Sequence, residues 1–530
     1  MNRTTLSLIA GTAALAAVTG FATLNQPESA GQDTARAAAE LPVERTSLLC
    51  PSPSTSDLAE TSYTSFTPVT KGTAATGTAE LTAAAGDAAA PTDTASGKTG
   101  DKAGDKAGDK ASGKPGGKAS GGTGDKASGK KKAAKPVVAP KTPGTPAVGV
   151  TTGGDAPALL GTAEGKFAPG WTVQATTEVV AGSGRGLQGL TCTAPDTEFW
   201  FPGASTSADR TDYVHLTNPD DSAAVVDVEL YGKGGVLAST VGEDITVPPH
   251  SSEPILLSTL TPEKQEDLTV HVNVRSGRLG AAVQALDAKL GGDWLASSAE
   301  PAATQVIPGI PKDATAVRLV AYAPGDADAD LKVQLASTSG LITPAGHETL
   351  HVKAGMTTSV DLGDVTRGEA GSLILTPTDH ATPVVAAVRV LRGKGDKQES
   401  AFIPAAGPVG ARASAADNAA RTASLSLTAP KGAAKVRVTA SAGSGGGTSV
   451  SQTYTVKAGT TLEVRPPVPA GLKGTFALTV EPLTATPVYA ARTLTVTQEG
   501  VSGFTIQTLP DDRGTVAVPQ VDEDIAVLQR

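Results

Sequence analysis

One pattern recurs three times along the chain with a period near 105 residues, and it limits the fold more than any other feature. Residues 352–357 (VKAGMT) recur as residues 456–461 (VKAGTT), and residues 247–252 (VPPHSS) are a weaker copy. In each copy a strand of small residues follows 35 positions later, at Ala282, Ala387 and Ala491. Each repeat is long enough for one domain, so the period predicts at least three tandem modules.

Two further landmarks keep this register. A turn proline precedes a strand valine in each copy, as Pro219 and Val228, Pro324 and Val333, and Pro430 and Val438. A hydrophobic residue followed by proline opens each copy, at Phe201-Pro202, Ile307-Pro308 and Ile403-Pro404. The landmarks lie 104 to 106 residues apart, except for the last opener interval, which shortens to 96.

Within one repeat the hydrophobic pattern is that of β-strands. Residues 268–275 alternate Leu or Val with Thr, His, Asn and Arg, so one face of this strand is apolar and the other polar. Turn signals such as Asn218-Pro219 and Lys431-Gly432 interrupt similar runs every 8 to 12 residues. This spacing predicts an all-β fold of tandem immunoglobulin-like or fibronectin-type β-sandwich modules, without the Cys…Trp…Cys arrangement of antibody domains.

The predicted domain boundaries follow from these landmarks. They are an export segment at 1–30, an N-terminal β domain at 41–86 plus 151–200, a spacer at 87–150, sandwich repeats at 201–304, 305–400 and 401–503, and a C-terminal strand and tail at 504–530. The pattern leaves open whether the N-terminal β domain is a fourth, diverged repeat.

The N-terminus predicts export. Arg3 precedes an uncharged stretch from residue 4 to residue 27 that carries Leu, Ile, Val and Phe side chains, as an export signal does. Its apolar part, residues 4–24, is long enough to span a bilayer as a helix, with Arg3 on the cytoplasmic side. We expect either a cleaved signal peptide or an uncleaved anchor, and in both cases an extracytoplasmic body.

A lysine-rich spacer follows the first β segment. Residues 98–141 hold twelve lysines and four aspartates with no Arg or Glu, a local net charge of +8 in a chain whose total is −9. Such a segment has no apolar face to bury and is expected to be disordered. Two interpretations remain: a solvated, extended spacer, or electrostatic attachment to an anionic wall polymer or lipid headgroups. Nucleic-acid binding is not expected, because no aromatic residues are interleaved with the lysines.

The chain has two cysteines, Cys50 and Cys192, which lack the spacing of a zinc or redox motif. In an exported protein a disulfide between them is the simplest interpretation, and two buried thiols are the alternative. If they pair, the lysine-rich spacer is an insertion within one N-terminal β domain.

The most prominent catalytic motif is His347-Glu348-Thr349-Leu350-His351, which matches the H-E-x-x-H of zinc peptidases. That motif requires a helix, on which both imidazoles reach one metal. In the repeat register these residues align with a strand, where positions i and i+4 lie roughly 13 Å apart. A zinc peptidase acting through His347 and His351 is therefore only a remote alternative.

No other site is predicted. Residues 326–330 (DADAD) resemble the start of a calcium loop, but Leu331 stands where the EF-hand requires glycine, which favours an acidic turn. Trp200 and Phe201 are expected to fill the junction between the N-terminal domain and the first repeat. The sequence therefore predicts no catalytic residues, no metal ligands and no cofactor, and its 3% aromatic content argues against a stacking platform for sugars.

The order of features resembles an uncharacterised family of secreted or membrane-anchored proteins from high-GC Gram-positive bacteria (actinobacteria). It runs from the apolar N-terminus through a Cys-bearing β region to residues 200–203 (WFPG) and the Asn218-Pro219 turn before residues 225–230. The resemblance covers most of residues 41–518 apart from the spacer. It implies an envelope location and a β-sandwich array, and it brings no catalytic residues.

We therefore expect a non-catalytic extracytoplasmic protein of the cell envelope, a modular scaffold or adhesion array whose partner is a protein or an envelope polymer. The alternative is an accessory or sensory subunit of a membrane complex that handles envelope polysaccharide. The N-terminal segment would contact the membrane in either case.

Overall fold

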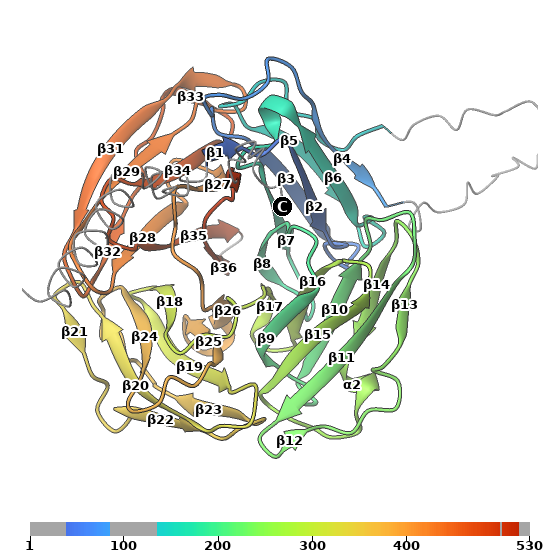
Figure 1. Ribbon diagram of the computed structural model, residues 1–530, viewed down its shortest axis with the longest axis vertical. Coiled ribbons are helices and arrows are strands. Elements are labelled where there is room, and N and C mark those ends of the chain that lie inside the picture. The colour runs from blue at the N-terminus through green and yellow to red at the C-terminus, as the bar shows by residue number, and fades with distance from the viewer. Residues whose placement is uncertain (1–38, 85–134, 499–500, 519–530) are drawn as a thin grey trace, which may run out of the picture. The chain divides into compact units, whose positions relative to one another are not determined.

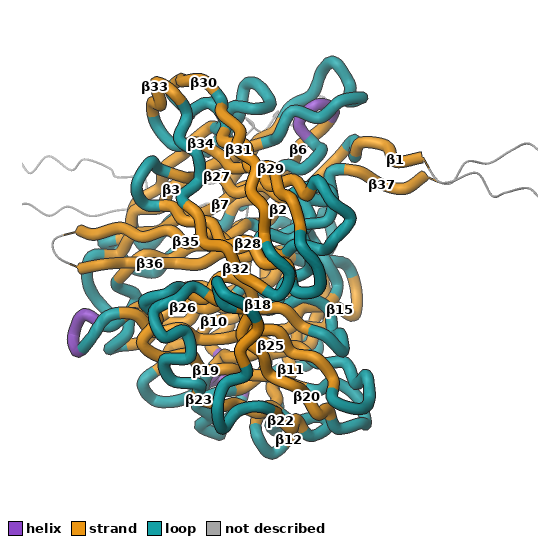
Figure 2. Tube along the Cα trace, turned by 90° about the vertical axis from the view of Figure 1, so that its left-hand side faces the viewer, coloured by secondary structure: helices purple, strands orange, loops and turns teal. Residues whose placement is uncertain are grey.

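The computed structural model describes residues 39–84, 135–498 and 501–518. Strands joined by loops make up nearly all of this part, and its helical segments are short: α2 (Leu257–Leu260), η2 (Gly165–Phe167) and η3 (Gly395–Lys397) (Figure 2). The predicted all-β fold is confirmed. The expected export helix and most of the Lys/Gly-rich insert lie outside the described residues. Within them, no helix is long and apolar enough to cross a membrane.

The strands group into four modules. The N-terminal module contains β2 (Arg45–Cys50), β3 (Ala59–Phe66), β4 (Ala79–Ala83), β5 (Ala147–Thr152), β6 (Leu159–Glu164), β7 (Thr172–Val179) and β8 (Gly186–Thr191). Module 1 contains β9 (Glu198–Ala204), β10 (Arg210–Thr217), β11 (Ala224–Gly232), β12 (Gly235–Val236), β13 (Ile245–Val247), β14 (Ser252–Leu256), β15 (Leu268–Ser276), β16 (Gly280–Asp287) and β17 (Gly291–Leu295).

Module 2 contains β18 (Gln305–Ile310), β19 (Ala314–Tyr322), β20 (Ala329–Ala336), β21 (Leu341–Ile342), β22 (Thr349–Val352), β23 (Thr357–Asp361), β24 (Gly371–Pro377), β25 (Val385–Arg392) and β26 (Glu399–Pro404). Module 3 contains β27 (Ala413–Asn418), β28 (Ala423–Ala429), β29 (Ala434–Ala440), β30 (Gly446–Thr448), β31 (Val450–Val456), β32 (Thr460–Val464), β33 (Ala470–Lys473), β34 (Phe476–Pro482), β35 (Tyr489–Gln498) and β36 (Val501–Thr508).

All four modules share one topology. In module 1 the first sheet contains the order β9-β15-β11, with β12 and β13 paired to β11, and the second sheet has the order β14-β10-β16-β17. The N-terminal module repeats this as β2-β6-β4 and β5-β3-β7-β8, and modules 2 and 3 follow the same scheme (Figure 1). The N-terminal β segment is therefore a fourth copy of the sandwich.

The N-terminal module is assembled from both sides of residues 85–134. The strand β4 pairs with β6, and β3 pairs with β5 and β7, so strands before and after this segment alternate within the same two sheets. The sequence assigned residues 87–150 to the disordered spacer, and for residues 135–150 this is wrong. Val138 bridges Leu81, and Ala147 begins β5.

The opener predicted for the last repeat is also wrong. Ile403-Pro404 lies in β26, which pairs with β25 and so completes module 2. The predicted boundary at residue 504, which made the following strand a separate C-terminal element, is wrong as well, because β36 pairs with β35 inside module 3.

The residues equivalent to the opener of module 3 can be found from the backbone. The first strands of modules 1 and 2 contain Gly203 and Gly309 at φ of 106° and 88°, and in module 3 Asp417 takes this conformation at φ of 59°. The equivalent opener is therefore at residues 415–417, where small residues replace the hydrophobic-proline pair.

The modules contact one another in a closed cycle. The first strand of each module packs against the second sheet of the next: β2 against β16, β9 against β25, β18 against β35 and β27 against β7. Arg412 strengthens the last of these junctions, because its guanidinium binds Asp512 of the segment after β36, at 2.5 Å, and Thr70 Oγ1 of the N-terminal module, at 3.0 Å. Hydrophobic residues continue across the junctions, since Phe402 of module 2 belongs to the core of module 1.

The last strands of the four modules, β8, β17, β26 and β36, meet at the centre of this cycle. Their equivalent middle positions hold Gln188, Asp293, Ala401 and Thr505, which are all buried. Asp293 Oδ1 accepts hydrogen bonds from Gly189 N at 3.1 Å and Thr505 Oγ1 at 3.0 Å. Three modules therefore meet at one buried carboxyl group.

The chain forms two compact units: Val43–Gly514, which contains the four modules, and the terminal segments Met1–Pro42 with Thr515–Arg530. In the terminal unit, β1 (Ala39–Pro42) pairs with β37 (Thr515–Val518), with Ala39 opposite Val518. In the larger unit, Val43 N donates a hydrogen bond to Gly514 O at 3.1 Å. The chain therefore begins and ends the larger unit at one place.

Candidate ligand-binding cleft

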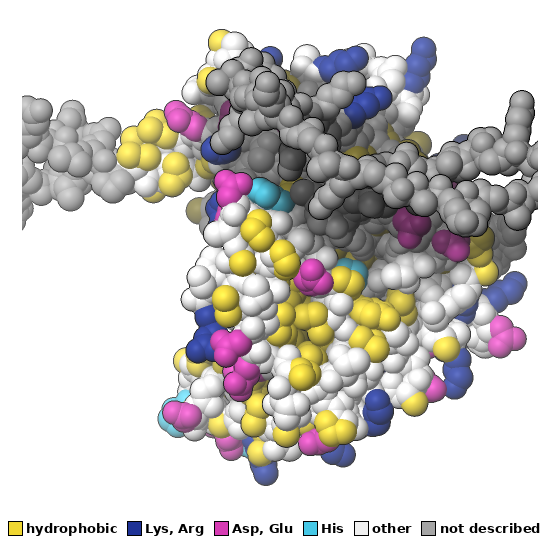
Figure 3. Space-filling view, turned by 90° about the vertical axis from the view of Figure 1, so that its right-hand side faces the viewer, with side chains coloured by type: hydrophobic (Ala, Val, Ile, Leu, Met, Phe, Trp, Pro, Cys, Tyr) yellow, Lys and Arg dark blue, Asp and Glu magenta, His cyan; other side chains and the backbone are white. Residues whose placement is uncertain are grey.

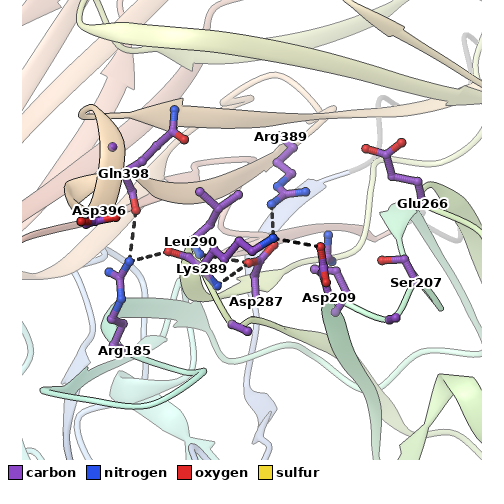
Figure 4. Close-up of a pocket in the computed structure, with 14 residues that line it drawn as sticks. Arg185, Ser207, Asp209, Glu266, Asp287, Lys289, Leu290, Arg389, Asp396 and Gln398 are labelled. Carbon is purple, nitrogen blue, oxygen red and sulfur yellow. Dashed lines mark hydrogen bonds and ion pairs between the residues drawn. The ribbon is translucent and has the colours of Figure 1, made fainter.

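The larger unit contains an open cleft of about 980 Å³ between modules. Three turns that lead into central strands line it. They contribute Arg185 before β8, Asp287 to Leu290 before β17, and Gly395, Asp396 and Gln398 before β26. Module 1 adds the loop between β9 and β10, which carries Ser207 and Asp209, and β25 adds Arg389 (Figure 4). The cleft thus depends on the contacts among the N-terminal module, module 1 and module 2.

Arg210 and Asp212 form the deepest ion pair beneath the cleft. Arg210 Nε donates to Asp212 Oδ1 at 2.9 Å and Nη2 to Oδ2 at 2.6 Å, and both side chains are almost completely buried. Burial raises the pKa of Asp212, while Arg210 opposes this rise. The Arg210 guanidinium also lies over the Phe402 ring, 5.2 Å from its centroid, which joins module 1 to module 2.

Arg389 and Asp287 form a second pair across the same junction. Arg389 Nη2 donates to Asp287 Oδ2 at 2.9 Å, with 14% and 9% of the side chains exposed. Burial and the neighbouring Arg210 hold the pKa of Arg389 below its usual range. Arg389 Nε is buried and has no hydrogen-bond partner within the described part of the chain.

Arg185 ties the N-terminal module to this site. Its Nη2 donates to Lys289 O at 2.5 Å and to Gln398 O at 3.4 Å (Figure 4). Its Nη1 lies 3.8 Å from Glu399 Oε1. Burial raises the pKa of Glu399 to about 7, against the attraction of Arg185. Near neutral pH this carboxyl group therefore carries only part of its negative charge.

The rim of the cleft is exposed and of mixed charge. Lys289 Nζ lies 3.5 Å from Asp209 Oδ2, with 77% and 68% of the side chains exposed, so water screens this pair. Glu266 and Asp396 add acidic groups, and Ser207 and Gln398 add neutral polar groups. Among the described residues, no aromatic side chain lines the cleft. The site can therefore form hydrogen bonds and ion pairs with a ligand but cannot stack against one.

The predicted disulfide between Cys50 and Cys192 is confirmed. It joins the end of β2 to the residue after β8, across 142 positions of sequence. Both cysteines belong to the hydrophobic core of the N-terminal module. The bond therefore links the first and last strands of this sandwich.

The H-E-x-x-H motif lies on a turn and on β22, not on a helix. His351 Nδ1 lies 2.8 Å from Asp330, and its Nε2 lies 3.5 Å from Asp328, so the residues of the DADAD segment pair with this histidine. Glu348 accepts a hydrogen bond from Gly346 N. Over the described ranges, no group of three or more His, Cys, Asp or Glu side chains is arranged to hold a metal ion.

Trp200 lies at a different junction from the one the sequence predicted. Its ring stacks on His271 at 3.7 Å within module 1 and on Tyr322 of module 2 at 5.4 Å. The residue therefore fills the contact between modules 1 and 2, because β9 packs against β25 of the next module rather than against the preceding one. His271 in turn contacts Glu229 and Glu198.

The cleft residues were not predicted from the sequence. Arg185, Asp287 and Arg389 are more than 100 positions apart, so no local sequence pattern links them. Comparison of the repeats could have pointed to Arg389. Gln284, Arg389 and Thr493 occupy equivalent positions in modules 1, 2 and 3, so module 2 has a charged side chain where modules 1 and 3 have a neutral one.

Residues 147–467 match the model of a family described as a family of unknown function (DUF5719). The match covers more than half of the chain and includes all or part of every module. No curated protein and no solved structure matches the chain.

Proposed function

We propose that this chain, which belongs to the DUF5719 family of unknown function, is a non-catalytic extracytoplasmic protein of the cell envelope that serves as a modular scaffold or interaction array. The observation that carries this proposal is the closed cycle of four sandwiches. Buried polar contacts at its centre and at its junctions fix the modules, so surfaces on different modules keep a constant spacing. Rigid presentation of surfaces is what a scaffold requires, although the fold alone does not determine a function.

Three observations support the envelope location. The Cys50–Cys192 disulfide is typical of proteins in an oxidising compartment. The apolar N-terminus has the composition of an export signal or anchor, and we propose that it contacts the membrane. The order of features resembles secreted and membrane-anchored proteins of high-GC Gram-positive bacteria.

The surface supports binding to a partner rather than to nucleic acid. On the face seen in Figure 3, basic and acidic side chains are interspersed, with hydrophobic side chains between them. The concentrated positive charge lies in residues 98–141, and we propose that it attracts an anionic wall polymer or lipid headgroups. This attraction would hold the modules close to the envelope.

A second candidate function is that of an accessory or sensory subunit of a membrane complex that handles envelope polysaccharide. The polar cleft favours this candidate, because its donors and acceptors suit a hydroxylated or charged chain. The two functions differ in whether the protein acts with a membrane-bound enzyme.

Proximity crosslinking in intact cells tests the proposal. The full chain is compared with a variant that lacks residues 87–134. The redox state of Cys50 and Cys192 reports the compartment, and a Cys50→Ser, Cys192→Ser variant is the control that cannot form the disulfide. We expect the full chain to fractionate with the envelope in disulfide-bonded form, and the deletion to lose crosslinks to wall polymer. Cytoplasmic, reduced protein would overturn the location. Identical partners with and without the insert would overturn the electrostatic role.

A further inference from the structure

We infer that the cycle of four modules opens reversibly at one junction, the contact between module 3 and the N-terminal module, while the four sandwiches and the other three junctions stay folded. We call this contact the seam. In the closed form the modules keep the constant spacing that a scaffold requires, and parting at the seam would release that spacing. This conformational change goes beyond the proposed function and is independent of where in the cell the protein lies.

Chain connectivity sets the seam apart from the other junctions. Short segments link β8 to β9, β17 to β18 and β26 to β27, so each of the other three junctions joins modules that are consecutive in the chain. Modules 1 and 2 separate the two partners of the seam along the sequence. A short link keeps two modules at a high effective concentration. The seam has no such link and depends on its own contacts.

The hydrophobic contacts across the seam are small. At the junctions between modules 1 and 2 and between modules 2 and 3 the cores merge, because Phe402 belongs to the core of module 1 and Phe504 to that of module 2. The core of module 3 and that of the N-terminal module each contain residues of one module alone. Two separate clusters of three buried residues bridge the seam: Phe66 with Ala416 and Ala477, and Leu187 with Ala423 and Leu494. Less apolar area therefore stabilises this contact.

A polar side chain replaces a small apolar one where the modules meet. Ala282, Ala387 and Ala491 occupy equivalent positions in modules 1, 2 and 3, on the strand against which the first strand of the preceding module packs. In the N-terminal module this position is Gln174 on β7, opposite Thr64 on β3, and β27 of module 3 packs there. The seam therefore buries an amide where the other junctions bury a methyl group.

Buried polar groups on both sides of the seam lack hydrogen-bond partners among the described residues. They are Thr64 Oγ1, Gln174 Oε1 and Thr176 Oγ1 of the N-terminal module and Ser414 Oγ on β27. Val173 and Ala175 belong to the core of their module, so Gln174 and Thr176, which alternate with them, face module 3. Leaving such groups buried without partners costs free energy, which water would return on opening. Closure of the seam is therefore opposed by its own polar surface.

Acidic groups also face one another across the seam. Burial, and then the negative charges of Glu60 and Asp417, raise the pKa of Glu178. The two glutamates belong to the N-terminal module and Asp417 to module 3. Like charges that are brought together in this way favour separation of the two modules.

Arg412 of module 3 acts against opening. Its Nη1 donates to Thr70 Oγ1 at 3.0 Å and its Nη2 to Pro169 O at 3.4 Å, both in the N-terminal module, while its Nε holds Asp512 at 2.5 Å. Gly170 allows this contact, because a Cβ at this position would lie 2.3 Å from Asp512 Oδ2. Removal of the guanidinium should therefore increase the population of the open form.

The test measures how fast buried thiols react with a maleimide in the folded full chain, by mass spectrometry. Ser414→Cys and Thr176→Cys place one thiol on each side of the seam, at side chains that are 7% and 8% exposed. Ser298→Cys is the control at the junction between modules 1 and 2, at 9% exposed, where the Oγ donates to Ala386 O. Loss of that bond would speed labelling of the control, against the expected difference. Cys50 and Cys192 are disulfide-bonded and do not react.

Each thiol is also measured with Arg412→Gln and with Arg389→Gln. Arg389 is the matched arginine, since both side chains are 14% exposed and each pairs with a buried aspartate, Asp287 or Asp512. We expect both seam thiols to react at least tenfold faster than Ser298→Cys, and a further fivefold faster with Arg412→Gln. Arg389→Gln should leave the seam rates unchanged.

Equal rates for all three thiols would mean that labelling requires global unfolding and would overturn the inference. Fast labelling of Ser414→Cys with slow labelling of Thr176→Cys would also overturn it, because β27 would then move without separation of the modules. Seam rates that Arg412→Gln leaves unchanged, or that Arg389→Gln raises equally, count against it in the same way. If the melting temperature shows that Arg412→Gln does not fold, Arg412→Lys decides, with an intermediate acceleration expected.

Discussion

Asp293 on β17 accepts a hydrogen bond from the backbone amide of Gly189 on β8 across 3.1 Å, although 104 positions separate the two residues. Thr505 of module 3 binds the same oxygen. Burial raises the pKa of Asp293 to about 8, while the nearby N–H groups of Gly189, Trp294 and Phe402 limit the rise. The carboxyl group that joins the modules is therefore largely protonated at neutral pH.

Asp293 makes stability depend on pH. Between about pH 4 and pH 8 the unfolded chain loses this proton while the folded chain retains it, so the free energy of unfolding falls as the pH rises. Asp293→Asn keeps an oxygen for Gly189 and Thr505 and removes the ionisation. We expect this variant to be more stable than the native chain at pH 8. In denaturant unfolding, its free energy of unfolding should also vary less with pH. If the free energy of the variant varied with pH as steeply as that of the native chain, the pH dependence would not come from Asp293.

His215 gives the opposite pH dependence, because it makes the free energy of unfolding fall as the pH falls. Burial lowers its pKa to about 4, so the unfolded chain gains a proton below about pH 6.5 that the folded chain excludes. Stability from this group is present above pH 6.5 and is lost as the pH falls toward 4, by roughly 3 kcal/mol. His215→Phe should remove most of this loss in chemical denaturation at pH 4 to 7. His380, which is exposed, provides the control as His380→Phe and should not alter the slope.

The disulfide and the sheet pairing should hold the N-terminal module together after cleavage. A lysine-specific protease is expected to cut first within residues 98–132. Because β4 pairs with β6 and Cys50 is bonded to Cys192, the two fragments should stay together, giving one band without reductant and two bands with it. The Cys50→Ser, Cys192→Ser variant should lose about 2–4 kcal/mol of stability. Two bands without reductant from the nicked native protein would contradict the pairing.

Arg492 should be essential to module 3 although it occupies a core position. It is fully buried where Val283 and Val388 lie in the other repeats, and its guanidinium binds the carbonyl groups of Ala416 and Asp417 and the side chain of Gln507. Burial lowers its pKa to about 10. Arg492→Val would leave these acceptors buried without a donor, at a cost of about 2–4 kcal/mol in denaturant unfolding.

The matched control is Arg421→Val, at an exposed position of the same module. We expect it to change stability by less than about 0.5 kcal/mol. If Arg492→Val were as stable as this control, the valines of the other repeats would be sufficient for the fold and the carbonyl contacts would have no structural role.

The H-E-x-x-H residues should not bind zinc tightly. His351 pairs with Asp328 and Asp330 on an exposed strand edge, and His347 lies on the preceding turn. We expect zinc to leave the melting temperature unchanged in the native chain and in a His347→Ala, His351→Ala double variant alike. A zinc-dependent rise that the double variant abolishes would revive the peptidase hypothesis.

The sequence was sufficient for the sandwich units but not for their number or arrangement. Alternation of apolar residues and the repeat spacing predicted the strands, since each sandwich buries one face of each sheet. The fourth copy was hidden because residues 85–134 interrupt the connection between its third and fourth strands. The opener of module 3 was misplaced because Ala415, Ala416 and Asp417 carry no hydrophobic-proline signal, and Arg492 stabilises this strand from a distant position.

The candidate cleft could not be predicted from the sequence, for a related reason. Arg185, Asp287 and Arg389 come together only when three modules close on one another, and no local pattern encodes that contact. Trp200 was assigned to the wrong junction because sequence order suggested the preceding module, whereas β9 packs on the following one.

The chain begins and ends the larger unit at one place, where Val43 N bonds to Gly514 O, and the next residues along the chain on each side, Pro42 and Thr515, are opposite each other in the β1–β37 pair. This pairing has a mechanical consequence. Tension applied between Ala39 and Val518, which lie opposite each other, would unzip the ribbon one residue pair at a time before it reached the Val43–Gly514 bond. The four sandwiches would bear no load until that bond broke, so a protein held by both ends would extend at low force with its modules intact.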